Sequence, residues 1–327
     1  MAPLQTKALR LNALLLEGIN KQGGFVNAHS HLDRAYSLTK SSFHFTNSTL
    51  QQKWNLIDTL KQKSNVSQIY DRMATGLEEM LKQKVQAIGS FIDVDCVIKD
   101  KAILAADRIK KNYGKKLKIK FINQVLKGVI DKESKYWFDY GAEFVDIIGG
   151  LPGKDKGKES EHLDIILSTA RGLKKMVHVH IDQLNSQLET ETQLLAKKTI
   201  EHKMEGSVVG IHGISIAAHP KKYRMNLYKL MKKAKLMMIS CPSAWIDSRR
   251  SEVVSVTHNA VTPIDELVPA GMITALGTDN ISDIYKPFSS GDLFTELKIL
   301  LESCHFYDIN SLVDIATVNG LKTLGIK

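Results

Sequence analysis

The chain has 327 residues, of which 43% are hydrophobic and 24% are charged, and its formal net charge at pH 7 is +10. This length suits one large domain or two modest ones, and the composition is ordinary for a soluble globular protein. No stretch approaches the roughly 20 apolar residues of a membrane span, and the apolar patch near the N-terminus lacks the small-residue cleavage site of a signal peptide.

Cysteine usage and the distribution of charge narrow the class of protein further. The three cysteines lie far apart and form no CxxC pair, which argues against a disulfide framework or a structural zinc site and favours a reducing cytoplasm. Basic residues are spread along the chain without regularly interleaved aromatic residues. We therefore interpret the charge as a solvated, lysine-rich surface, with the steering of an anionic substrate and RNA binding as the alternatives.

Short apolar runs typical of strands alternate with longer amphipathic segments typical of helices. The expected strands are residues 24–31, 85–94, 117–126, 143–150, 176–182, 207–212, 236–242 and 272–279. The clearest helical segments, with apolar residues at intervals of three and four, are 67–84, 159–175, 188–203, 291–303 and 308–323. Parallel strands need crossover helices, and eight such units close a barrel, so we predict an α/β fold with a single (β/α)8 TIM barrel.

Histidine and aspartate residues fall at the ends of these expected strands. His29 and His31 are two residues apart at the end of the first strand, so they share one face of it. His180 ends the fifth strand, His212 the sixth and Asp279 the eighth. Barrel enzymes build their active sites at these ends. Imidazoles with one carboxylate suit Zn²⁺ or Fe²⁺ and leave room for a water that the metal activates.

The segments around these residues resemble known motifs. They read FVNAHSHLD (25–33), HIDQ (180–183), GIHG (210–213) and ALGTDN (275–280). Together with their spacing they resemble the amidohydrolase superfamily and, within it, the cytosine-deaminase-like branch. The resemblance covers roughly residues 24–325, which is nearly the whole chain.

The resemblance implies a role for each of the five residues. It implies that His29, His31, His180 and Asp279 bind one divalent metal ion, Zn or Fe. It also implies that His212 orients the water or polarises the substrate, and that Asp279 accepts the proton of the water as a general base. His212 and Asp279 are therefore the expected catalytic residues.

Four further residues are expected to contact the substrate. The resemblance matches Gln124, at the end of the third strand, to a glutamine that contacts the substrate ring. It matches Tyr285 to an aromatic residue that covers the substrate, and it places Gln183 and Asn280 at the same site. From the residues alone, Gln124 is equally well explained as a loop residue and Tyr285 as a packing residue.

One departure from the family pattern concerns catalysis. Gln183 stands where the deaminases carry a glutamate that shuttles protons to the substrate ring. An amide cannot act as a general acid or base, although the adjacent Asp182 could substitute. This weakens the interpretation as a cytosine deaminase without weakening that as a metal hydrolase. It leaves a catalytically impaired, metal-binding barrel as the alternative.

A second departure concerns domain organisation. Relatives carry a small β-sandwich formed by segments on either side of the barrel, whereas here only residues 1–23 precede the first strand. We expect the sandwich to be absent or reduced, with residues 1–23 as a remnant segment and residues 24–327 as the barrel. An exposed barrel edge would favour a homo-oligomer. Members of this superfamily that bind two metal ions carry a bridging, carboxylated lysine at the end of the fourth strand. Here the nearest lysine, Lys154, lies in the following loop, so the resemblance implies a single metal ion.

These observations predict a cytoplasmic, metal-dependent amidohydrolase or deaminase. It would hydrolyse a non-peptide C–N bond of a small pyrimidine-, triazine- or pterin-like ring through a metal-bound hydroxide, with no nucleic-acid or membrane partner. Asp33 and Arg34 are expected to pair with each other or to contact the substrate, and His178 to lie in the core. Surface positions are expected for the remaining histidines, His44, His162, His202, His219, His258 and His305.

Overall fold

Eight parallel strands form the centre of the molecule. The computed structural model describes residues 10–47, 50–245 and 260–327. Each strand pairs with the next in chain order, and the strands are β1 (Phe25–Ser30), β2 (Val85–Asp93), β3 (Lys118–Gln124), β4 (Ile147–Gly150), β5 (Met176–Ile181), β6 (Val208–His212), β7 (Met237–Ser240) and β8 (Thr274–Leu276). A bridge between Ser30 and Asp279 joins the ends of the first and last strands. This confirms the predicted (β/α)8 barrel.

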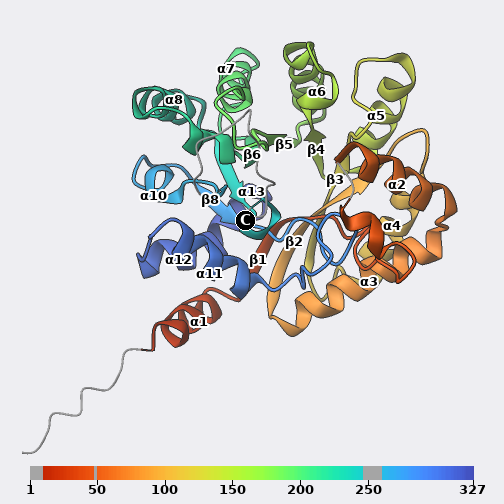
Figure 1. The fold of residues 1–327 in the computed structure, drawn as a ribbon, viewed down its shortest axis with the longest axis horizontal. Helices are drawn as coiled ribbons and strands as arrows, with labels where there is room; N and C mark the ends of the chain where they lie inside the picture. Colours follow the sequence, from red (N-terminus) through yellow and green to blue (C-terminus); the bar gives the residue numbers. More distant parts are fainter. Residues whose placement is uncertain (1–9, 48–49, 246–259) are drawn as a thin grey trace, which may run out of the picture.

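Most of the helices lie around the outside of the barrel, and the last one lies near its centre in this view (Figure 1). The helices are α1 (Leu11–Lys21), α2 (Leu50–Lys63), α3 (Val66–Lys82), α4 (Lys101–Tyr113), α5 (Lys132–Phe144), α6 (Glu159–Leu173), α7 (Glu191–Glu201), α8 (Lys221–Ala234), α9 (Pro242–Trp245), α10 (Ile264–Leu267), α11 (Leu293–Ser303), α12 (Ile309–Ala316) and α13 (Val318–Thr323), with short 3₁₀ turns η1 (Phe43–Asn47), η2 (Pro152–Lys154) and η3 (Ile214–Ala218).

Helix α3 illustrates why these segments form helices. Its buried residues include Ile69, Met73, Leu77 and Met80, at the spacing of three and four that lines one helical face. A capping box at Asn65 satisfies the first free backbone N–H groups and starts the helix. The apolar face then packs against the barrel, which accounts for the helix predicted over 67–84.

The boundaries differ from the predicted ones where a neighbouring element takes over. Helix α5 continues to Phe144, so β4 begins only at Ile147 rather than at residue 143. The helix predicted over 308–323 is divided at Thr317, whose φ of −135° and ψ of −97° lie outside the helical region.

Among the described residues, no helix is long and apolar enough to cross a membrane.

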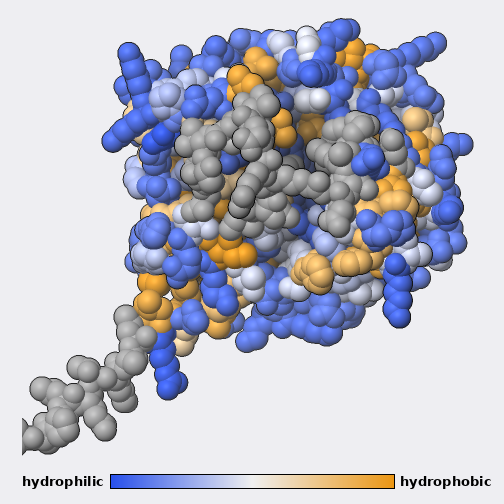
Figure 2. All heavy atoms as spheres, viewed as in Figure 1, coloured by the Kyte–Doolittle hydropathy of each residue, from blue (hydrophilic) through white to orange (hydrophobic). Residues whose placement is uncertain are grey.

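The inside of the barrel is packed at its amino-terminal end. Val26, Phe91, Ile122 and other apolar side chains from successive strands form this inner core. His178 is buried beneath them, with Nε2 2.7 Å from the carbonyl oxygen of Thr323 at the end of α13, as predicted for a core histidine. Polar groups therefore gather at the opposite end, the mouth of the barrel. Hydrophilic residues predominate around the periphery of the face shown in Figure 2.

Candidate metal centre and active site

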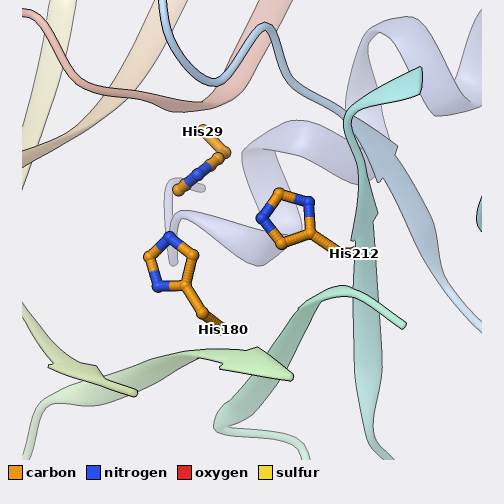
Figure 3. Close-up of side chains that lie close together, drawn as sticks. All are labelled: His29, His180 and His212. Atoms are coloured by element: carbon orange, nitrogen blue, oxygen red, sulfur yellow. The ribbon is translucent and has the colours of Figure 1, made fainter. Parts of the chain in front are cut away.

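The histidines and the aspartate singled out in the sequence meet at the mouth of the barrel. His29, His180 and His212 each place a ring nitrogen within 4.8 Å of the others, and their rings converge in Figure 3. His29, His31 and Asp279 form a second such group that shares His29. All five side chains are buried. The structure thus brings together every predicted metal ligand, with His212 beside them.

Strained backbone at two strand ends aims side chains at this cluster. His212 has a φ of 72° and Asp279 a φ of 58°, in the left-handed region that non-glycine residues rarely occupy. The carbonyl oxygen of His212 accepts a hydrogen bond from the hydroxyl of Thr262, and the backbone N–H of Asp279 donates to the His29 carbonyl at 3.0 Å. These bonds hold both residues in conformations that turn them away from the strand direction.

Gly277 allows β8 to approach β1 closely enough for this arrangement. A Cβ atom at Gly277 would lie 2.8 Å from the Cβ of His29 and 2.9 Å from its carbonyl oxygen, which is too close for any side chain. The glycine of the ALGTDN segment is therefore required by the close contact between Asp279 and the first histidine pair.

Burial sets the protonation of the imidazoles. It lowers the pKa of His212 to about 3 and the pKa values of His31 and His180 well below their usual range, so these rings are neutral at pH 7. Burial opposes the charge of Asp279 as well, but the adjacent imidazoles of His29 and His31 hold the pKa of this carboxyl well below its ordinary value. The cluster thus combines neutral imidazoles with an ionised carboxylate.

This cluster fits a divalent metal ion. Nδ1 of His29 and both ring nitrogens of His180 are buried without a hydrogen-bond partner among the described residues, and Nε2 of His29 lies 3.4 Å from Asp279 Oδ1. Buried polar atoms normally have partners, so several unpaired nitrogens around one point indicate a missing ligand. Neutral imidazoles with one carboxylate are the donor set of Zn²⁺ and of Fe²⁺.

Phe91 forms a floor beneath the cluster and was not singled out in the sequence. Its ring centroid lies 5.0 Å from that of His29 and 4.7 Å from that of His180. It belongs to β2, two residues before Asp93, and is fully buried. An aromatic ring here excludes water from the inner side of the imidazoles. Its position on an inward-facing strand register was the one signal that could have identified it.

Two of the predicted substrate contacts lie at the same mouth with free polar atoms. Gln124 is the last residue of β3, and its Oε1 is buried without a partner among the described residues. The hydroxyl of Tyr285 is also buried without such a partner, and the guanidinium carbon of Arg34 lies 5.4 Å from the centre of its ring. Both groups are thus available to a ligand.

Asp182 does not face the cluster, so it does not substitute for the missing glutamate. Its carboxylate accepts hydrogen bonds from the backbone N–H groups of Glu191 and Thr192 and from the Thr192 hydroxyl, at the start of α7. Its own N–H donates to the Glu191 carboxylate at 2.9 Å. Asp182 is therefore a structural anchor for the loop that carries the half-buried Gln183.

The burial of Glu191 makes the stability of the protein depend on the protonation of this side chain. Burial, together with the carboxylates of Asp182, Glu189 and Glu159, raises the pKa of Glu191 from its ordinary value of 4.5 to about 8. The folded protein therefore holds a proton that the unfolded chain releases. The contribution of this group is complete below pH 4.5 and is lost as the pH rises through about 8.

We therefore expect Glu191→Gln to raise the melting temperature at pH 8.5 by about 1–3 °C, because the buried charge is removed. At pH 5 the same variant should melt within about 1 °C of the unchanged protein. Calorimetry at the two pH values measures both effects. Glu201→Gln, on the exposed side of the same helix, is the matched control and should show no such pH dependence. An equal shift at both pH values would contradict the assignment.

Arg34 and Asn280 have partners that the sequence did not predict. Arg34 forms ion pairs with Asp93 at 3.6 Å and with Asp283 at 3.8 Å, whereas Asp33 accepts the backbone N–H of Asp93. The expected pairing of Asp33 with Arg34 is therefore wrong. Asn280 accepts a hydrogen bond from Arg34 and donates one to Asp279.

Two histidines expected on the surface are buried. His162 lies on the apolar face of α6, beside Leu163 and Ile166, with Nδ1 2.6 Å from Asp155 Oδ2. His219 is also buried, and its Nε2 lies 2.7 Å from the Glu189 carbonyl oxygen. Both predictions were wrong because a histidine can be buried where a nearby carboxylate or carbonyl oxygen offers its ring a hydrogen bond, as Asp155 and Glu189 do here. His44 and His305 are exposed, His202 is half-buried, and His258 lies outside the described residues.

Comparison with known proteins places the chain in a family. The model of the amidohydrolase family matches residues 23–327. The chain belongs to the amidohydrolase family. This membership makes it a hydrolase that acts on carbon–nitrogen bonds other than peptide bonds, as the motifs predicted.

Three relatives of this amidohydrolase illustrate the range of similarity. An uncharacterized protein of Haemophilus influenzae is 51% identical over 255 residues, which are 77% of this chain and 92% of that protein. N-isopropylammelide isopropyl amidohydrolase of a Pseudomonas species is 23% identical over 93% of this chain and 74% of its own. The structure of 5-methylcytosine deaminase from Klebsiella pneumoniae, bound to 5-fluorocytosine, superposes with a TM-score of 0.84 at 20% identity, covering 92% of this chain and 74% of that one.

Proposed function

We propose that this amidohydrolase belongs to the cytosine-deaminase-like branch and uses one divalent metal ion, zinc or iron, to hydrolyse a C–N bond of a small cyclic substrate. The observation that carries the proposal is the meeting of four buried imidazoles and one carboxylate at one point, where Nδ1 of His29 and both ring nitrogens of His180 have no hydrogen-bond partner among the described residues. His29, His31, His180 and Asp279 would hold the metal. Bound there, the metal would lower the pKa of a coordinated water and polarise the substrate carbon.

The residues of the chain would supply proton transfer and orientation. Asp279 takes a proton from the attacking water and delivers it to the leaving nitrogen, so that a C–O bond forms as the C–N bond breaks. His212 is neutral and can donate one hydrogen bond to the oxygen that forms on the attacked carbon. Phe91 keeps water away from the inner side of the imidazoles.

The polar groups at the mouth favour a heteroaromatic ring with amide-like edges. An amide such as that of Gln124 both donates and accepts, which matches a ring nitrogen beside a carbonyl or amino group. Tyr285 and Gln183 would complete the pocket. The named relatives, an ammelide derivative hydrolase and a methylcytosine deaminase, act on rings of this kind. We therefore propose an aminopyrimidine, triazine or pterin as the substrate.

A screen of aminopyrimidines, triazines, pterins and cyclic ureas with the zinc- and iron-loaded protein tests the proposal. Release of ammonia or an alkylamine would be detected by a coupled assay, and the ring product by mass spectrometry. Turnover of at least one ring that disappears with a chelator and returns with metal is the expected result. Stoichiometric metal without turnover of any ring would favour the alternative, a metal-binding barrel that lacks catalysis.

Gln183 gives a direct test of the branch. We expect Gln183→Glu to create or raise deamination of cytosine-like rings by about 10-fold or more, because a carboxyl can shuttle the proton that an amide cannot. The measurement is kcat/KM for cytosine and for the best ring of the screen, with Gln187→Glu in the same loop as the control. No gain on any cytosine-like ring would mean that the pocket is not shaped for them.

A further inference from the structure

We propose that Arg34 is a positioning residue, which acts through the side chain of Asn280 to hold the Asp279 carboxylate in place. The proposal rests on the proposed function, in which Asp279 binds the metal and carries the proton. Nε of Arg34 donates to Oδ1 of Asn280 at 3.1 Å, and Nδ2 of Asn280 donates to Oδ1 of Asp279 at 3.2 Å. The three side chains thus form a continuous relay from a buried cation to the carboxylate.

The relay defines which oxygen of Asp279 is held. Oδ1 receives the hydrogen bond of Asn280 and also faces Nε2 of His31 at 3.1 Å and Nε2 of His29 at 3.4 Å. Rotation of the carboxyl group would break the bond to Asn280. The relay therefore keeps Oδ1 at the imidazoles and fixes the orientation of the carboxylate.

Two buried carboxylates form ion pairs with Arg34. Asp93, at the end of β2, lies 3.6 Å from Nη1, and Asp283, after β8, lies 3.8 Å from Nε. Asp93 is in turn held by Lys61 of α2 at 3.2 Å. Arg34 is 5% exposed, so the ion pairs are shielded from solvent. A planar guanidinium can contact these groups at once, which a single ammonium cannot.

These contacts give Asn280 a different role from the one expected from the sequence. Both polar atoms of its side chain are bonded within the protein, and the residue is 9% exposed. A residue that contacts substrate would mainly change KM when it is replaced, whereas a residue that orients a metal ligand changes metal affinity. The two roles can therefore be separated without knowledge of the substrate.

The experiment measures Zn²⁺ affinity, by competition with a chromophoric chelator, in Arg34→Lys, Asn280→Leu and the double variant. Each single variant should bind Zn²⁺ about 10–100-fold more weakly, as expected when the support of a metal ligand is lost. If the relay acts as a unit, the double variant should be no weaker than the worse single variant. With the ring identified by the screen, kcat should fall while KM stays within about 2-fold.

Asn280→Leu retains every ion pair of Arg34, so it remains informative if Arg34→Lys does not fold. Arg224→Lys is the matched control. Arg224, on α8, is likewise an arginine paired with a carboxylate, because it donates two hydrogen bonds to Glu266 on α10. This variant should leave Zn²⁺ affinity unchanged. An unchanged Zn²⁺ affinity in Asn280→Leu, or effects of the two variants that add, would overturn the relay. Failure of the unsubstituted protein to bind Zn²⁺ would instead overturn the proposed function.

Discussion

Asp279→Asn is expected to reduce kcat for the ring identified by the screen by about 10²–10⁴-fold, the usual range for the loss of a general base. The amide keeps the size of the side chain and could still contact a cation through its oxygen, but it cannot accept a proton. Steady-state kinetics on protein with a measured metal content provides the test. A loss of activity is expected because Asp279 lies beside His29 and His31, two of the proposed metal ligands.

The matched control for this substitution is Asp164→Asn. Asp164 lies on α6 and pairs with Lys198 and His202, outside the barrel. Activity should be retained in this variant. An Asp279→Asn protein with normal metal content and nearly full turnover would show that another group takes the proton.

His180→Ala should weaken Zn²⁺ binding by more than about 100-fold, which exceeds the loss expected from removing a supporting residue. The reason is that both ring nitrogens of His180 are buried and unpaired among the described residues, and the ring lies 4.9 Å from that of His29. Zinc content after dialysis against a weak chelator gives the measurement. The activity of the screen should disappear with the metal.

His178→Ala separates metal binding from simple loss of a buried histidine. His178 shares the face of β5 with His180, but its Nε2 contacts the carbonyl oxygen of Thr323 at the closed end of the barrel. We expect this variant to melt at a lower temperature and to keep its zinc. If both variants retain zinc equally, His180 is not a ligand.

Hydrophobic patterning was sufficient to predict the architecture, since strands buried in a barrel appear as short apolar runs and helices as stripes of period 3.6. It located all eight strands to within a few residues, but it overextended β4 and β8. These errors arose where α5 continued into the expected strand and where Gly277 to Asp279 form irregular backbone. Local patterns do not record such competition between neighbouring elements.

The sequence by itself determined the barrel and the five residues at its mouth, because strand parity and strand ends are local properties. Only the tertiary structure decided how the surrounding polar groups are used. Asp182 turns toward α7, and Arg34 bonds to a side chain 246 residues away in sequence. Such choices depend on which partners lie within hydrogen-bonding distance after folding, and a buried charge must find one wherever it lies in the chain.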